Sequence, residues 1–151
     1  MTVAEHVHPD DTVTEIERRL AATDQRLTKA RTTVIDTLRG AGRPVTADEI
    51  LAATPGLSQS SLYRNLAVFE TAGVVVRIQS ADGRARFELS EEIAGHHHHL
   101  ICTNCGSIDD VALPDHLEGE LDSVLAQVAR VSGFAMDHHR LDVVGLCRDC
   151  R

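Results

Sequence analysis

The chain has 151 residues, 42% of them hydrophobic, which suits one domain or two small ones, and we favour two. It shows neither a signal-peptide pattern nor an apolar run of about 18 residues, so we expect a cytoplasmic protein that is neither secreted nor membrane-spanning. The net charge of −8 argues against nucleic-acid binding only as an average, because residues 1–17 carry −5, residues 18–86 carry +5 and residues 87–151 carry −8.

Three short helices are predicted in the first half of the chain. Each begins at a threonine that can cap the first turn: Thr14, Thr28 and Thr46. Thr14 and Thr46 also have a glutamate three residues later, which is the spacing of a capping box. Glycines end the second helix and Pro55-Gly56 ends the third. Residues 1–12 are expected to form a flexible arm before them.

A fourth helix is predicted over residues 58–73, where apolar side chains at i, i+4 and i+7 form an inner face. Two strand-like segments follow, GVVVRIQ and RARFEL, separated by the strong hairpin signal Asp82-Gly83. In the second segment, apolar residues alternate with Arg84, Arg86 and Glu88. Helices followed by a hairpin predict a winged-helix domain.

A winged helix indicates DNA binding. The fourth helix would enter the major groove, where Tyr63 would contact thymine methyls or phosphate and Arg64 guanine or the backbone. Ser60 lies on the same outer side, and Arg26 and Lys29 would add charge near phosphate or the minor groove. The alternative is a solvated surface, since helix-turn-helix patterns are common.

Two CxxC pairs predict a structural zinc site, formed by Cys102, Cys105, Cys147 and Cys150. Each pair can present two thiolates to one tetrahedral ion. A reducing cytoplasm disfavours disulfides, although paired disulfides and free redox thiols are the alternatives. The wide separation of the pairs requires the second to return across an intervening fold.

The run of four histidines, residues 96–99, enters a strand-like stretch in which successive side chains point to opposite faces. His97 and His99 should therefore share one face, and His96 and His98 the other. Two further metal sites are expected, with partners among Glu88, Asp110, Glu118, Glu120, His138 and His139. The alternative is a solvated histidine-rich turn.

In this order, the motifs resemble the winged-helix, metal-responsive repressors of the ferric uptake regulator family, over nearly the whole chain after the first dozen residues. The motifs are SSLYRNLAVFETAGVV, RFEL, HHHHLICTNCG and HHRLDVVGLCRDC. The resemblance implies an α+β protein with a winged-helix DNA-binding domain in residues 1–92 and a small α/β dimerisation and metal-binding domain in residues 93–151. It also implies a homodimeric repressor that binds an AT-rich inverted repeat in double-stranded DNA when its regulatory metal is bound.

The resemblance also implies three metal sites. The structural zinc falls on the four cysteines. The regulatory metal falls on Glu88, His97, His99 and Asp110. An additional site falls on His96, His98, Glu118 and His139, and Glu120 and Asp122 stay open as alternatives to Glu118.

One ligand of the family pattern is missing. Many relatives add a histidine to the regulatory site just before a segment like VTADEI, and this chain has Pro44 there. His6, His8 or water would complete the site instead.

The donors do not decide which metal is sensed, because imidazole and carboxylate suit Fe(II), Zn(II) and Mn(II). Ser90 stands where zinc-sensing relatives often have a cysteine, which disfavours zinc, whereas the unbroken HHHH is common in them. Glu88 resembles the iron-responsive pattern, since peroxide-sensing relatives typically carry aspartate there. We favour iron, then zinc, then peroxide sensing.

Two other classes fit less well. The signatures of zinc deaminases and of metalloproteases, H-x-E with P-C-x-x-C and H-E-x-x-H, are absent, so we expect no enzyme and no small-molecule substrate. A zinc-binding interaction module would leave the basic segment and Tyr63-Arg64 unexplained. We expect a metal-bridged closed pose that fits DNA, and no membrane partner.

Overall fold

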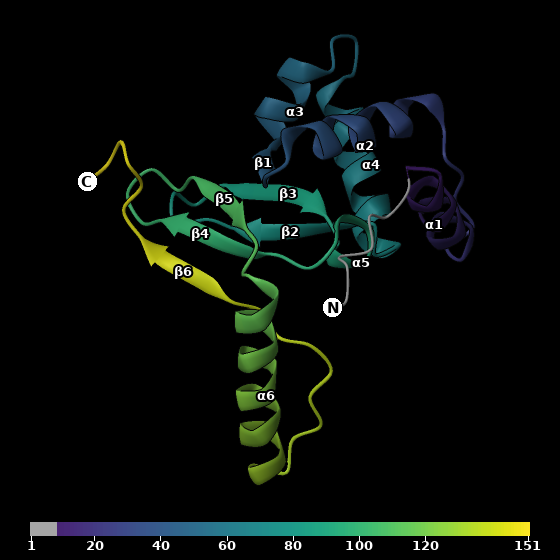
Figure 1. The fold of residues 1–151 in the computed structure, drawn as a ribbon. Coiled ribbons are helices and arrows are strands. Elements are labelled where there is room, and N and C mark those ends of the chain that lie inside the picture. The colour runs from purple at the N-terminus through teal and green to yellow at the C-terminus, as the bar shows by residue number, and fades with distance from the viewer. Residues whose placement is uncertain (1–8) are drawn as a thin grey trace.

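The structure is a computed structural model that describes residues 9–151. Its helices are α1 (Pro9–Ala21), α2 (Lys29–Ala41), α3 (Ala47–Ala53), α4 (Gln59–Thr71), α5 (Glu91–Ala94) and α6 (Asp115–Val131). Its strands are β1 (Val45–Thr46), β2 (Val75–Gln79), β3 (Ala85–Leu89), β4 (His98–Cys102), β5 (Ile108–Val111) and β6 (Asp142–Gly145). The α+β class predicted from the sequence is confirmed (Figure 1). No helix in residues 9–151 is long and apolar enough to cross a membrane.

The sequence predicts a capping residue at the start of each of the first four helices, and three of these predictions, for α2, α3 and α4, are confirmed. Thr28 Oγ1 accepts a hydrogen bond from the main-chain nitrogen of Arg31, and Ser58 caps α4 in the same way. Thr46 and Glu49 form a complete capping box at α3. The predicted start at Thr14 is wrong, because α1 already begins at Pro9, and proline suits a first helical turn.

The earlier start also corrects the expected arm. Residues 9–12 belong to α1, so an arm over residues 1–12 is wrong for these four positions. His6 and His8, the proposed substitute ligands, lie outside the described residues.

Two three-stranded sheets organise the chain. The first has the order β1-β3-β2 and is antiparallel; β2 and β3 form the predicted hairpin, and the two-residue β1 is a strand that the sequence did not predict. The second has the order β5-β4-β6, with β4 antiparallel to β5 and parallel to β6. The parallel pairing brings the C-terminal cysteine pair back beside the first.

Both faces of β3 are covered. Phe87 and Leu89 face the apolar core, but the alternating charged residues Arg86 and Glu88 are also buried, at 7% and 6% exposure. This follows from the central position of β3 and from contacts of its polar face with the histidine segment and of the hairpin turn with the first cysteine pair. The wing therefore packs on the second sheet.

The hydrophobic core lies among α1–α5 and the first sheet, and includes the predicted inner face of α4, Leu62, Leu66 and Phe69. By contrast, α6 has no buried residue and extends away from the two sheets (Figure 1). Large apolar side chains stay exposed on α6 and β6 and near their ends: Leu117, Val124, Val128, Val131, Phe134, Val143, Val144 and Leu146. An uncovered apolar face of this size indicates a binding surface.

Candidate metal centres and nucleic-acid face

The first cluster joins the two sheets and consists of Glu88, His97, His99 and Asp110, whose ligand atoms lie within 4.8 Å of one another. We call it the junction cluster. Glu88 comes from β3, and the other three residues come from the histidine segment, β4 and β5. His97 Nε2 and His99 Nε2 each lie 3.1 Å from a carboxylate oxygen of Glu88. Both nitrogens are 4.0 Å from Asp110.

The protonation states of the junction cluster depend strongly on one another. The hydrogen bond to Glu88 raises the pKa of His97 to about 9 and also raises the pKa of His99. Burial opposes ionisation of Glu88, but the hydrogen bonds from His97 and His99 outweigh it and lower the pKa of the carboxyl. Burial raises the pKa of Asp110. Imidazolium groups therefore balance the acid charge in a site whose donors suit a divalent cation.

The imidazoles of the junction cluster are oriented through their second nitrogens. His97 Nδ1 donates a hydrogen bond of 2.8 Å to the carbonyl oxygen of Gly95. His99 Nδ1 donates to Asp142 Oδ1 at 3.2 Å. Both Nε2 atoms consequently face Glu88, as an imidazole ligand requires.

The second cluster consists of His96, His98, Glu118 and His139, again with ligand atoms within 4.8 Å of one another. We call it the helix cluster, because α6 supplies its carboxylate. Glu118 lies 3.1 Å from His96 Nε2 and 2.9 Å from His98 Nε2. His139 Nε2 is buried and lies 3.0 Å from Glu118, but outside hydrogen-bonding geometry, so its ring nitrogen has no hydrogen-bond partner in residues 9–151.

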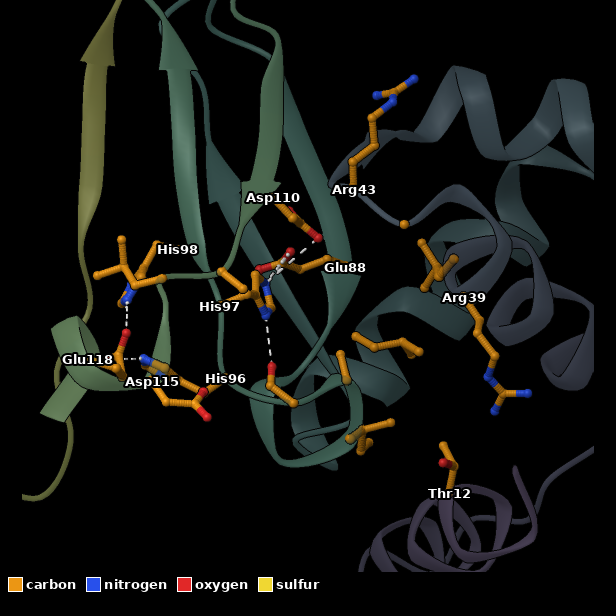
Figure 2. A pocket seen from close by; sticks show the side chains of 18 residues that line it. Thr12, Arg39, Arg43, Glu88, His96, His97, His98, Asp110, Asp115 and Glu118 are labelled. Atoms are coloured by element: carbon orange, nitrogen blue, oxygen red, sulfur yellow. Dashed lines mark hydrogen bonds and ion pairs between the residues drawn. The ribbon is translucent and has the colours of Figure 1, made fainter. Parts of the chain in front are cut away.

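The open choice of carboxylate has a clear geometric outcome. Glu118 points into the helix cluster (Figure 2), whereas Asp122 accepts a hydrogen bond of 2.9 Å from His139 Nδ1 on the outer side. Glu120 and His138 belong to none of the clusters found in the described chain. Glu91 similarly contacts His96 Nδ1 at 2.9 Å. Asp122 and Glu91 thus orient imidazoles rather than face the centre.

The third cluster is formed by the two CxxC pairs, whose sulfur atoms lie within 4.8 Å of one another. All four cysteines are free thiols, and Cys105 Sγ lies 3.8 Å from Cys147 Sγ. A tetrahedral zinc with Zn–S bonds of about 2.3 Å places its sulfurs about 3.8 Å apart, far beyond a disulfide bond of about 2.05 Å. The geometry therefore fits a closed four-thiolate site.

Hydrogen bonds to these sulfur atoms stabilise the thiolate form, which is the form that binds a cation. The main-chain N–H groups of Cys105 and Cys147 lower the pKa of Cys102 to about 6. Asn104 Nδ2 donates to Cys150 Sγ at 3.3 Å, but the neighbouring thiols raise the pKa of Cys150 to about 11. Four thiols this close cannot all ionise without a counter-ion.

A cavity of about 720 Å³ opens beside the junction cluster. Figure 2 shows Glu88, His97 and Asp110 on one side of the cavity, and Arg39 and Arg43 on the other. The two arginines belong to the helical unit, by which we mean α1–α4 and their connections. Pro44 adds no ligand, and no residue of 9–87 joins the cluster. The junction cluster therefore opens onto a cavity, whereas the thiolate cluster joins two chain segments that lie far apart in the sequence.

The predicted DNA contacts are all exposed, and Tyr63 is 50% exposed on α4. Ser60, Tyr63 and Arg64 share the outer side of this helix, opposite the buried Leu62 and Leu66. Arg26 and Lys29 lie in the turn before α2 and at its start. Arg31, which the sequence did not single out, contacts Asn65 of α4 at 3.3 Å and the carbonyl of Arg26 at 2.6 Å, and so ties this turn to the helix.

Comparison with known proteins gives a consistent picture. The sequence profile described as "Ferric uptake regulator family" matches residues 22–144. The chain is 35% identical over 135 residues to the peroxide operon regulator of Bacillus subtilis, which covers 87% of this chain and 88% of that protein.

Solved structures share the fold. A structure of the Helicobacter pylori ferric uptake regulator, described as revealing three functional metal binding sites, aligns over 99% of this chain and 97% of that one, with a TM-score of 0.75 and 21% identity. A zinc-bound manganese uptake regulator aligns over 88% of this chain and 98% of that one, with a TM-score of 0.62 and 27% identity.

Proposed function

Because the chain belongs to the ferric uptake regulator family, we propose that it is a metal-dependent repressor that binds an inverted-repeat operator as a homodimer. Family members are transcriptional regulators that bind DNA operators and act as dimers, and are not enzymes. The observation that carries the proposal is the junction cluster, which draws one carboxylate from the wing and three donors from the second sheet.

The three clusters take three roles in this proposal. The thiolate cluster holds a structural zinc, because its four donors are soft thiolates that can complete a tetrahedral site without water. The junction cluster holds the regulatory metal, since it is accessible and joins two units, and the helix cluster holds an additional ion. The count agrees with the three sites described for the Helicobacter pylori relative. Residues 1–92 then act as the DNA-binding unit and residues 93–151 as the dimerisation and metal-binding unit.

Fe(II) is the regulatory metal that we propose, because Ser90 stands where zinc-sensing relatives often have a cysteine and Glu88 resembles the iron-responsive pattern. Two imidazoles with carboxylate and no thiolate are typical of non-haem Fe(II), and Zn(II) is second because it also accepts nitrogen and oxygen ligands. Mn(II) is third: the carboxylate oxygens of the site suit it, but they do not select it over other divalent cations.

The switch follows from where the donors sit. A bound metal supplies positive charge that compensates Glu88 and Asp110. Glu88 is held by β3, so fixing it against His97 and His99 fixes the wing relative to the second sheet. A coupling of about 1–3 kcal/mol between the two sites corresponds to about 5- to 150-fold in operator affinity.

The homodimer follows from the uncovered apolar face of α6 and β6. Val128 is 57% exposed and Phe134 70% exposed, although both are large apolar side chains. In addition, β6 lies at the edge of its sheet, where its outer main-chain groups have no strand partner in residues 9–151. A second copy presenting the same face would bury both features symmetrically.

The test is a DNA titration with defined metal content. Dialysed protein should retain about one zinc per chain and bind a labelled AT-rich inverted-repeat duplex weakly. Anaerobic addition of Fe(II) should raise the affinity by at least tenfold, more than Zn(II) or Mn(II) does at equal free concentration. Glu88→Ala should abolish the response, whereas Glu92→Ala, an exposed glutamate outside the clusters, should retain it. Equal responses of both variants would overturn the regulatory assignment.

Peroxide response is the second candidate, because the curated relatives at 35% identity are the peroxide operon regulator of Bacillus subtilis and the peroxide-responsive repressor of Staphylococcus saprophyticus. Hydrogen peroxide added to the Fe(II)-loaded complex with DNA distinguishes the two. A peroxide sensor would release the duplex and keep its zinc. An iron sensor would stay bound under the same exposure.

A further inference from the structure

Asp142 connects β6 to the junction cluster. It is the first residue of β6 and the parallel-register partner of His99 in β4. Its Oδ1 accepts a hydrogen bond of 3.2 Å from His99 Nδ1, and the main-chain nitrogen of His99 donates to the carbonyl of Leu141 at 3.2 Å. His99 is therefore held by β6 through both its ring and its backbone.

The Asp142 contact decides which ring nitrogen of His99 faces the site. A carboxylate can only accept, so the hydrogen bond to Asp142 keeps a proton on Nδ1, and Nε2 is the nitrogen that loses its proton and offers a lone pair when a metal binds. His99 Nε2 lies 3.1 and 3.3 Å from the two oxygens of Glu88. The ring is 4% exposed, so it has little room to take another orientation once Asp142 is in place.

The two imidazoles of the junction cluster differ in what orients them. His97 Nδ1 donates to the carbonyl of Gly95, two residues earlier in the same segment. His99 instead depends on a strand that ends near the second cysteine pair. That end of β6 is anchored, because Thr103 donates to the carbonyl of Gly145 at 2.8 Å and the main-chain nitrogen of Cys147 donates to Cys102 Sγ at 3.4 Å.

We propose that Asp142 is a positioning residue for the regulatory metal, which acts by fixing the ring of His99 and by tying it to the strand that leads into the thiolate cluster. The inference rests on the proposed role of the junction cluster. Asp142 does not join that cluster and its side chain is 46% exposed, so as a plain ion pair it adds little to folding stability. Its contribution is to ligand orientation, and loss of such an outer partner costs about 10- to 100-fold in metal affinity.

The test uses full-length protein with its zinc retained, and Co(II) as a spectroscopic probe of the second metal. Asp142→Ala should weaken Co(II) binding at the junction cluster by about 10- to 100-fold and change its visible absorption bands. Asp142→Asn should recover most of the affinity, because its amide oxygen can still accept from Nδ1. Asp109→Asn is the matched control, since it removes the same charge from an exposed position next to Asp110. It should stay within about twofold of the parent.

The outcomes separate the two proposals. If Glu88→Ala abolishes Co(II) binding while Asp142→Ala keeps the affinity and spectrum of the parent, the positioning role is wrong and the regulatory site stands. If Glu88→Ala also binds Co(II) as the parent does, the regulatory assignment itself fails. If Asp109→Asn and Asp142→Ala lose the same amount of Co(II) affinity, Asp142 acts only through its charge and the inference is overturned.

Thermal unfolding of each zinc-loaded variant checks that folding is intact. If the alanine variant does not fold, Asp142→Leu takes its place, because leucine has a similar size and cannot accept a hydrogen bond from His99 Nδ1. The leucine variant should show the same loss of Co(II) affinity, and parental affinity in it would overturn the positioning role.

Discussion

Ser80 Oγ donates a hydrogen bond of 2.5 Å to the carbonyl oxygen of Gly106, so the turn of the β2–β3 hairpin is docked on the first cysteine pair. Asp82 completes the contact. A Cβ atom at Gly106 would lie 2.5 Å from Asp82 Cγ, and Asp82 is held in place by two hydrogen bonds of 3.0 Å from Arg86. The wing and the thiolate cluster therefore pack as one unit.

Gly106→Ala should disturb this contact specifically. Both Gly106 and Gly42 have positive φ angles, of 71° and 58°, but only Gly106 has a neighbour where the Cβ would lie. Alanine at Gly42 should cost about 1–2 kcal/mol from the left-handed backbone alone. Gly106→Ala should cost more and should also weaken operator binding, because the wing is displaced. Urea unfolding and DNA titration check this, and equal losses in the two variants would contradict it.

Metal binding at the junction cluster should strengthen as pH rises. The hydrogen bond to Glu88 raises the pKa of His97 to about 9 from an ordinary 6.5, so the metal-free ring is protonated at neutral pH. The interaction of protonated His97 with Glu88 therefore stabilises the folded state fully below pH 6.5, and this stabilisation is lost as pH rises through about 9. A metal must displace this proton, so affinity should rise by up to about tenfold per pH unit for each proton released, and level off above pH 9. Competition titrations from neutral to alkaline pH measure the slope, and a flat profile would refute the coupling.

Tyr63 and Arg64 should matter for DNA and not for folding. Tyr63→Ala and Arg64→Ala should each weaken operator binding by about 1–3 kcal/mol if they read base edges. If Arg64 contacts only phosphate, its loss should weaken all sequences alike and reduce the salt slope by about one. Arg148→Ala, which removes an exposed charge outside the helical unit, is the control. Unchanged affinity in both α4 variants would exclude this face as the DNA-binding surface.

Leu66→Ala should instead act on folding. Leu66 is 1% exposed in the core and belongs to the same helix as Tyr63. Truncation of a buried leucine costs about 2–5 kcal/mol, depending on how far the cavity collapses. Chemical denaturation of the zinc-loaded protein measures the loss, and Tyr63→Ala is the comparison within α4. A loss below about 1 kcal/mol for Leu66→Ala would show that this core is looser than its burial indicates.

Val128→Asp should separate the two subunits. Val128 is 57% exposed on α6, in a helix without buried residues, so a charge there would disrupt an interface and not a core. Val13→Asp on α1, where valine is 38% exposed, is the control. Sedimentation should show a monomer for Val128→Asp and a dimer for Val13→Asp. A stable dimer in both variants would place the interface elsewhere.

The sequence alone determined those features that depend on neighbours in the chain. The capping box of Thr46 and Glu49, the inner face of α4 and the Asp82-Gly83 turn are local, because each follows from side chains within one or two helical turns or one hairpin. The ligand types were equally visible, since CxxC spacing and consecutive histidines restrict the chemistry before any fold is known.

Only the tertiary structure decided which residues far apart in the chain meet. It brought Glu118 rather than Asp122 among the imidazoles of the helix cluster, and placed Asp142 behind His99 through a parallel strand pairing with no local signal. It also buried Arg86 and Glu88, although their alternation with apolar residues marked a polar face. The physical reason is that the position of a carboxylate in a site depends on sheet order and register, and these are fixed by the packing of the whole chain.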